Sequence, residues 1–228
     1  MNDPYNAPPV NPLPPVVILL FVAIILPEAA FSLGAQGWIG GADAIGWRLA
    51  AVQHYGFSGD VFDWMMSTGN WVPEHLLRFV SYSFVHPNFT GTIFAAVLML
   101  ALGKMVGETM GQVAVLVLYF GGSIFGAFIY ALLLNDPEWL VGGFPAAYGL
   151  IGGYSFLMWQ KLAEAGQQQL RAFNLIAMLM GIQLLFGVFF GPTTQWVADL
   201  GSFVFGFMAS MVLVPGGLAR VIYYLRRD

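Results

Sequence analysis

Six apolar stretches follow one another between residues 15 and 214, and this pattern limits the chain to a helical membrane protein. A bilayer-spanning helix needs about 20 predominantly apolar residues. The stretches cover residues 15–35, 88–106, 112–134, 145–159, 173–190 and 194–214. Only 9% of the 228 residues are charged, whereas soluble domains carry about 25%. We therefore expect an all-α membrane protein with six transmembrane helices.

The segment between the first two stretches, residues 37–73, is too polar to span a membrane. It holds four of the seven tryptophans, and aromatic side chains of this kind favour the membrane interface. We expect an amphipathic, partly helical loop that lies on the membrane surface. The expected domain organisation is a proline-rich cytoplasmic tail at 1–14, a membrane domain at 15–216 and a basic cytoplasmic tail at 217–228.

The basic residues predict how the chain is oriented. With six spans, both termini and the loops after the second and fourth spans share one side of the membrane. Six of the eight basic residues fall on that side, namely Lys104, Lys161, Arg171, Arg220, Arg226 and Arg227. The positive-inside rule then places both termini in the cytoplasm. No basic patch indicates nucleic acid, and the absence of cysteine excludes disulfides and thiol chemistry.

Small residues at four-residue spacing occur in three of the stretches. Gly122 and Gly126 form one row, Gly149 and Gly153 a second, and Ala198, Ser202 and Gly206 a third. Such rows allow helix backbones to approach closely inside a membrane, where no hydrophobic drive brings helices together. A compact bundle is expected.

Three motifs, taken with the long loop after the first span, resemble the rhomboid family of intramembrane serine proteases. The segment 78–86, RFVSYSFVH, is similar to the stretch that leads into the family's second span. The segment 142–152, GGFPAAYGLIG, is similar to the family's serine motif at the start of the fourth span. The segment 198–206, ADLGSFVFG, is similar to the sixth-span motif. The resemblance implies a six-span rhomboid-like bundle.

The resemblance also implies where the catalytic groups would lie, and this sequence lacks them. A rhomboid protease activates a serine of the fourth span with a histidine of the sixth, as a hydroxyl needs a base within hydrogen-bond reach. Phe144 stands at the serine position, followed by Pro145, and Asp199 stands at the histidine position. The oxyanion positions fall at Gly91 or Thr92 and at Ala95 or Ala96, where no oxyanion-stabilising side chain is expected. We therefore predict a catalytically inactive member, or pseudoprotease.

Two acidic residues lie inside expected spans, where ionisable groups are costly and are candidates for function. Asp199 is the first of them. Tyr148 occupies the family's aromatic position opposite the histidine, so a Tyr148–Asp199 hydrogen bond that joins the fourth and sixth spans is the leading interpretation. A client-binding group or a proton-linked site is the alternative for Asp199. Glu28, which follows Pro27, is expected to face the bundle or the headgroups in a structural role.

Two further polar residues match family positions. Arg78 precedes the second span and is expected to anchor the loop to backbone carbonyls or headgroups. Glu108 lies four residues after Lys104, a spacing that favours an ion pair on a helix. His86 has no partner at metal-ligand spacing. No metal and no cofactor are expected.

The resemblance suggests a function for a chain without the catalytic pair, because inactive rhomboids and derlins bind transmembrane clients. We expect a protein that binds other integral membrane proteins, as an escort or adaptor or as an accessory subunit of a membrane complex. The alternatives are an intramembrane peptidase with atypical chemistry, or a small transporter that uses Asp199 and Glu28. The expected location is the cytoplasmic membrane of a bacterium.

Overall fold

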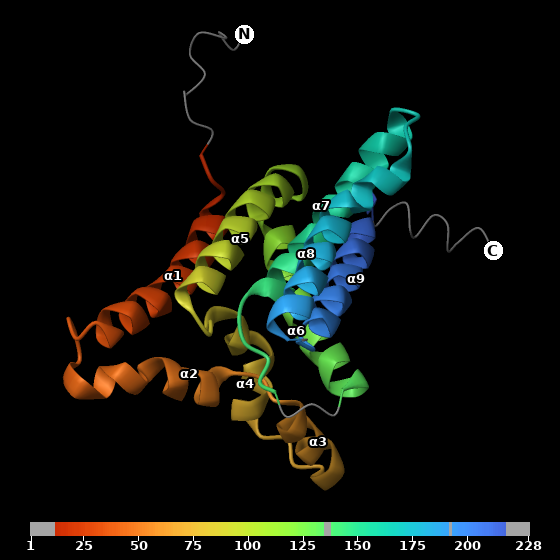
Figure 1. Ribbon diagram of the computed structural model, residues 1–228. Helices are drawn as coiled ribbons and strands as arrows, with labels where there is room; N and C mark the ends of the chain where they lie inside the picture. The colour runs from red at the N-terminus through yellow and green to blue at the C-terminus, as the bar shows by residue number, and fades with distance from the viewer. Residues whose placement is uncertain (1–11, 135–137, 192, 218–228) are drawn as a thin grey trace.

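The computed structural model describes residues 12–134, 138–191 and 193–217 and is helical throughout this part, apart from one antiparallel bridge between Phe57 and Leu140 (Figure 1). The predicted tails at 1–14 and 217–228 fall almost wholly outside the described residues. The long helices are α1 (Pro15–Ala35), α5 (Phe89–Met110), α6 (Gln112–Leu133), α7 (Phe144–Glu164), α8 (Asn174–Phe190) and α9 (Trp196–Leu213).

Local chemistry explains where several of these helices begin and end. Proline stands in the first turn of α1 and of α7, where its missing N–H leaves no bond unmade. Asn88 caps α5, because its side-chain oxygen accepts a hydrogen bond from the Gly91 N–H at 2.8 Å. Gly111, with φ of 91°, separates α5 from α6 in a backbone conformation that glycine adopts without strain.

Five helices of the described chain are long and apolar enough to cross a membrane, and α7 is not one of them. The six-span count is therefore not confirmed. The physical reason lies in the composition of α7, which is rich in glycine and alanine and buries most of its first fourteen residues. A helix surrounded by other helices does not need the lipid-facing side chains that raise mean hydropathy. The bounds of α1 and α6 agree with the predicted stretches to within one residue.

The centre of the bundle is built from α6, α7 and α9, whose backbones nearly touch. A side chain at Gly206 would collide with the carbonyl oxygen of Gly149, and one at Gly149 would collide with that of Leu118. The Ser202 hydroxyl donates to the Gly122 carbonyl at 2.8 Å across the α9–α6 contact. The predicted small-residue rows therefore mark the helix contacts, as their spacing indicated.

The segment between α1 and α5 folds into short helices at one end of the bundle, opposite the turn between α7 and α8 (Figure 1). They are η2 (Gly41–Gly46), α2 (Trp47–Tyr55), α3 (Gly59–Thr68), α4 (Pro73–Ser81) and η3 (Tyr82–Phe84). A second apolar cluster, which includes Phe57, Phe79 and Tyr130, packs α3 and α4 against α6. Trp38 is 75% exposed and Trp71 is 50% exposed, so both of these side chains lie on the surface of the protein.

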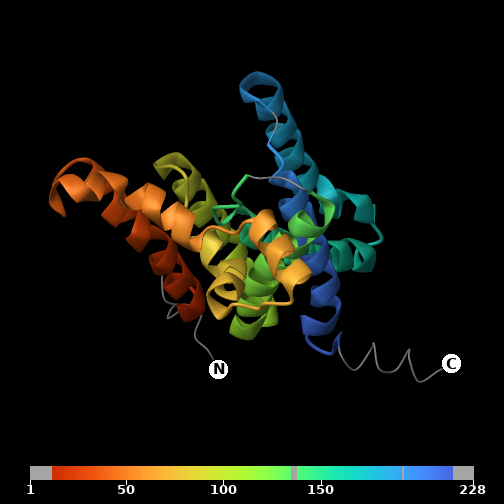
Figure 2. The ribbon, with the colours of Figure 1, turned by 90° about the horizontal axis from the view of Figure 1, so that it is seen from below.

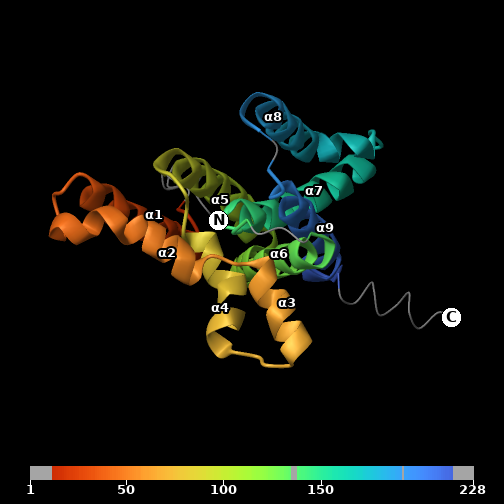
Figure 3. The same cartoon turned by 60° about the horizontal axis from the view of Figure 1, so that its bottom comes forward.

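Two pairs of helices form the periphery of the bundle, on different sides. The α1–α2 pair projects from one side, and η4 (Gln169–Phe173) with α8 lies at another edge (Figures 2 and 3). Of the five candidate spans, the one that contains α8 has the smallest buried share, 11% against 28% to 50% for the others.

Candidate functional site

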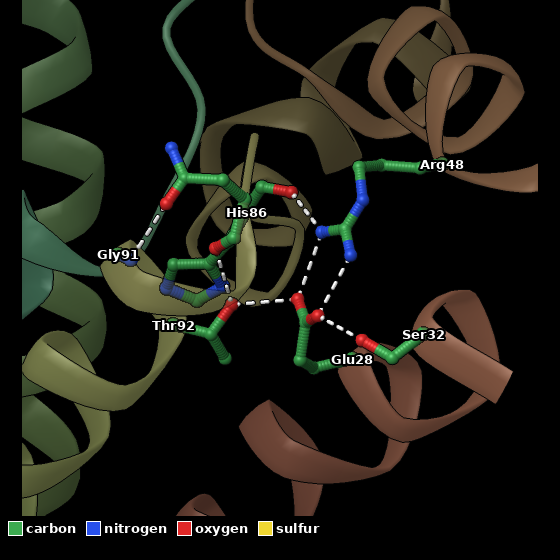
Figure 4. Close-up of polar contacts among 7 residues, drawn as sticks. Glu28, Ser32, Arg48, His86, Gly91 and Thr92 are labelled. Atoms are coloured by element: carbon green, nitrogen blue, oxygen red, sulfur yellow. Dashed lines mark hydrogen bonds and ion pairs between the residues drawn. The ribbon is translucent and has the colours of Figure 1, made fainter. Parts of the chain in front are cut away.

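Glu28 lies at the centre of a polar cluster that joins α1, α2 and α5 (Figure 4). The Arg48 guanidinium donates to both carboxylate oxygens, at 2.7 and 2.8 Å, in a two-pronged ion pair. The Ser32 and Thr92 hydroxyls each donate at 2.7 Å. Four hydrogen bonds to one carboxylate compensate for its burial, because Glu28 is only 3% exposed.

The same cluster continues from Arg48 to the segment before α5. Arg48 donates a further hydrogen bond to the His86 backbone carbonyl at 3.0 Å, and its guanidinium lies over the Phe31 ring, 5.3 Å from the ring centroid. The neighbouring carboxylate raises the pKa of Arg48 above its ordinary value. The amphipathic segment is thus tied to the first span and to the entry of α5 by one side chain.

His86 connects this cluster to the start of α7. Its Nε2 accepts a hydrogen bond from the backbone N–H of Gly143 at 2.9 Å, so the proton of the neutral ring lies on Nδ1. A Cβ on Gly143 would lie 3.0 Å from the Ser83 carbonyl oxygen and 3.3 Å from His86 Nε2, so a larger residue there would require these neighbours to shift. His86 therefore holds the backbone beside Phe144, at the position predicted for a nucleophile.

Burial lowers the pKa of His86 to about 4, and Glu28 only partly offsets this effect. The ordinary pKa is 6.5, so on acidification the unfolded chain binds the proton before the folded one. The stability that neutral His86 contributes is fully present above pH 6.5 and is lost as the pH falls toward 4. We expect His86 to cost about 2 kcal/mol of unfolding free energy between pH 7 and pH 5, measured by thermal unfolding in detergent.

The matched control is His86→Gln, because its side-chain carbonyl can accept from the Gly143 N–H and does not titrate. This variant should lose most of the acid sensitivity. An acid shift of equal size in the variant and the wild type would contradict the assignment to His86.

The two positions of the family's catalytic pair carry groups of a different kind. Phe144 begins α7 and packs against the main apolar cluster, and Pro145 follows it as a buried residue. Asp199 lies in the first turn of α9 and is fully buried. The positions predicted for the family's serine and histidine thus hold an apolar ring and a carboxyl group.

The predicted partner of Asp199 was wrong. Its recorded hydrogen bond comes from the Gln183 side chain of α8, whose Nε2 donates to Asp199 Oδ2 at 2.7 Å. Tyr148 is buried on α7, at 1% exposure, but it is not the group bonded to Asp199. The bond therefore joins α8 to α9, and not the fourth to the sixth predicted span. Gln183 lies one helix away along the chain, so family position gave no sign of it.

The structure bears differently on the predictions for Arg78 and Glu108. Arg78 is 8% exposed, and its guanidinium lies over the Trp139 ring at 5.6 Å, a cation–π contact. This contact joins Arg78 to the loop before α7, and the expected contact with headgroups stays a prediction. Glu108 lies 3.9 Å from Lys104, which agrees with the pair expected from their spacing.

The predicted oxyanion positions lie along the first turns of α5. Thr92 does carry a hydroxyl donor, against expectation, but its proton is shared between Glu28 and the Asn88 carbonyl, at 2.7 and 3.0 Å. Ala95 and Ala96 are both 1% exposed and supply no donor. Gly91 contributes only its backbone N–H, which the Asn88 side chain already accepts.

The buried hydroxyls of the described chain mostly donate to backbone carbonyls. This holds for Ser83, Ser123, Ser202 and Ser210. Ser155 is buried with its hydroxyl unpartnered. Within the described residues no group of three histidine or acidic side chains gathers in a way that could hold a metal ion.

Arg48, His86 and Gln183 are the site residues that sequence reasoning missed. Arg48 carried one usable signal, as it is a basic residue close to the end of a span that contains a buried acid. His86 was assessed only as a metal ligand, although a histidine before a span can also serve as a backbone acceptor. The only signal for Gln183 was that it carries a side-chain amide within an otherwise apolar stretch.

The family model for the rhomboid domain matches residues 73–216. This range covers more than half of the chain, so the protein belongs to the rhomboid family and is a membrane protein of that type. The match begins at α4 and ends just after α9. A comparison with curated proteins found no match.

Proposed function

We propose that the protein is a non-catalytic member of the rhomboid family that binds other integral membrane proteins, as an escort or adaptor or as an accessory subunit of a membrane complex. The observation that carries the proposal is the pair of groups at the family's catalytic positions, Phe144 and Asp199. A phenyl ring supplies no nucleophile, and Asp199 is engaged by Gln183.

The remaining polar groups support the same conclusion. His86 is the histidine nearest to the start of α7, and its Nε2 already accepts the Gly143 N–H, so it cannot take a proton from a hydroxyl without breaking that bond. Glu28 accepts four hydrogen bonds and is paired with Arg48. This pairing makes Glu28 a structural group and weakens the transporter alternative, which needs an acid free to change partners.

The binding surface that we propose is the outer face of α8. Its most exposed apolar residues include Leu184, Val188 and Phe189, at 68%, 81% and 75%. Among the candidate spans α8 is the least covered by the rest of the chain, so a transmembrane helix of a partner can pack on it. We further propose that α7 also crosses the membrane, which brings the number of spans to six, and that both termini lie in the cytoplasm of a bacterium.

The absence of catalysis is tested by fluorophosphonate labelling and by cleavage of a transmembrane reporter in proteoliposomes, beside an active rhomboid protease. We expect neither labelling nor cleavage above background. Ser155→Ala is the matched variant, because Ser155 is a buried serine whose hydroxyl has no recorded partner. Labelling that disappears in Ser155→Ala would establish an atypical peptidase and overturn the non-catalytic proposal.

The binding surface is tested by photo-crosslinking from position 188 in native membranes. The matched control is position 113 on α6, where Val113 is 71% exposed and faces outward in the same way. We expect membrane-protein adducts from position 188 and few from position 113. Equal yields from the two positions would argue against α8 as the binding surface.

A further inference from the structure

The contact between α8 and α9 contains two oxygen atoms without partners. Gln183 Nε2 donates to Asp199 Oδ2 at 2.7 Å, while the other oxygen of each group, Gln183 Oε1 and Asp199 Oδ1, is buried without a hydrogen bond. Both are acceptors when Asp199 is ionised. An unpartnered buried acceptor costs about 1 to 3 kcal/mol, so two of them on interacting side chains require an explanation.

A single proton satisfies both atoms. If Asp199 carries it on Oδ1, the carboxyl group can donate to Gln183 Oε1 while Gln183 Nε2 donates to Oδ2. The result is a cyclic acid–amide pair with two hydrogen bonds and no net charge. We propose that Asp199 and Gln183 form a buried proton-binding site, and that the bound proton latches α8 to α9.

The surroundings of Asp199 favour the neutral acid. It is fully buried, and the titratable groups near it are two phenols, Tyr148 from α7 and Tyr82 from η3. No cation of the described chain forms an ion pair with it. Its place in the first turn of α9 favours a charge by about 0.3 to 1 kcal/mol. Burying an unpaired carboxylate away from water costs several kcal/mol, so the cost of the charge is larger than this gain.

The proton has a structural consequence because α8 has little other cover. Its outer face is exposed. Within the described residues, the Gln183–Asp199 bond is the one side-chain hydrogen bond between α8 and α9. Ionisation of Asp199 would remove one of the two bonds and place a charge in the contact. We therefore expect α8 to be held against α9 in the protonated state and to separate from it when the proton leaves.

The proton itself is detected by infrared spectroscopy at neutral pH in a detergent without ester carbonyls. We expect a protonated-carboxyl band in the wild-type spectrum that is absent from the spectrum of Asp199→Asn. This variant can still form two hydrogen bonds with Gln183, because its amide supplies a donor and an acceptor that do not titrate. A wild-type spectrum without such a band would overturn the proposal.

The latch is tested by pulsed electron spin resonance in proteoliposomes. The chain contains no cysteine, so labels can be placed on Cys introduced at Met178 of α8 and Val204 of α9, both exposed. We expect one narrow distance distribution in Asp199→Asn at every pH, and a broad one in Gln183→Ala. In the wild type the distribution should broaden as the pH rises. A Gln183→Ala distribution as narrow as that of Asp199→Asn would overturn the latch.

Discussion

Replacing Gly206 by alanine is expected to destabilise the protein by about 3 kcal/mol or more, the upper range for overpacked cores. The added methyl group would collide with the Gly149 carbonyl, which belongs to the backbone of α7 and cannot rotate away. Relief requires α9 to move from α7, which would also strain the Ser202 bond to the Gly122 carbonyl. Thermal unfolding in a mild detergent measures the effect.

Gly181→Ala is the matched control. Gly181 lies within α8, and a Cβ there would meet no atom within 4 Å. Alanine is the better helix former by about 1 kcal/mol, so this variant should be neutral or slightly more stable. A Gly206→Ala protein that unfolds at the temperature of Gly181→Ala would contradict the close α7–α9 contact.

Arg48→Ala is expected to have the second large effect, about 3 kcal/mol, or a fall of about 6 to 12 °C in melting temperature for a chain of this size. The substitution removes two of the four hydrogen bonds on Glu28 and leaves a carboxylate at 3% exposure without its counter-charge. The Arg48 side chain is 25% exposed, which places the expected cost at the lower end for buried pairs.

Two further variants test whether the lost stability comes from the unpaired carboxylate of Glu28. Lys104→Ala removes an ion pair within one helix, in which both side chains are more than 30% exposed, and should cost less than about 0.5 kcal/mol. Glu28→Gln added to Arg48→Ala should recover much of the lost stability, because it removes the stranded charge. If the double variant is no more stable than Arg48→Ala alone, the loss does not come from an unpaired carboxylate.

The bundle was largely predictable because its determinants are local. The apolar stretch at 15–35 became α1 with the same bounds, since length, hydropathy and an early proline all act within one segment. The small-residue rows also identified the contacting faces of α6, α7 and α9. The count of spans did not follow in the same way, because α7 is surrounded by protein and lacks the hydropathy by which a lipid-facing helix is detected.

The polar contacts were less predictable because most of them join residues far apart in the sequence. Arg48 lies 20 residues from Glu28, and Thr92 lies 64 residues from it. The sequence marked Glu28 and Asp199 as unusual, since acids in apolar stretches are rare. It did not identify their partners, and for Asp199 the family position of Tyr148 pointed to the wrong helix.

The central claim, a non-catalytic protein that binds membrane proteins, is tested most directly by purifying the tagged protein from its native membrane and quantifying co-purifying proteins by mass spectrometry. We predict enriched integral membrane proteins, either one at fixed stoichiometry, which defines an accessory subunit, or several at lower stoichiometry, which defines an escort. Recovery of the chain alone, at a yield that would reveal a stoichiometric partner, would contradict the account.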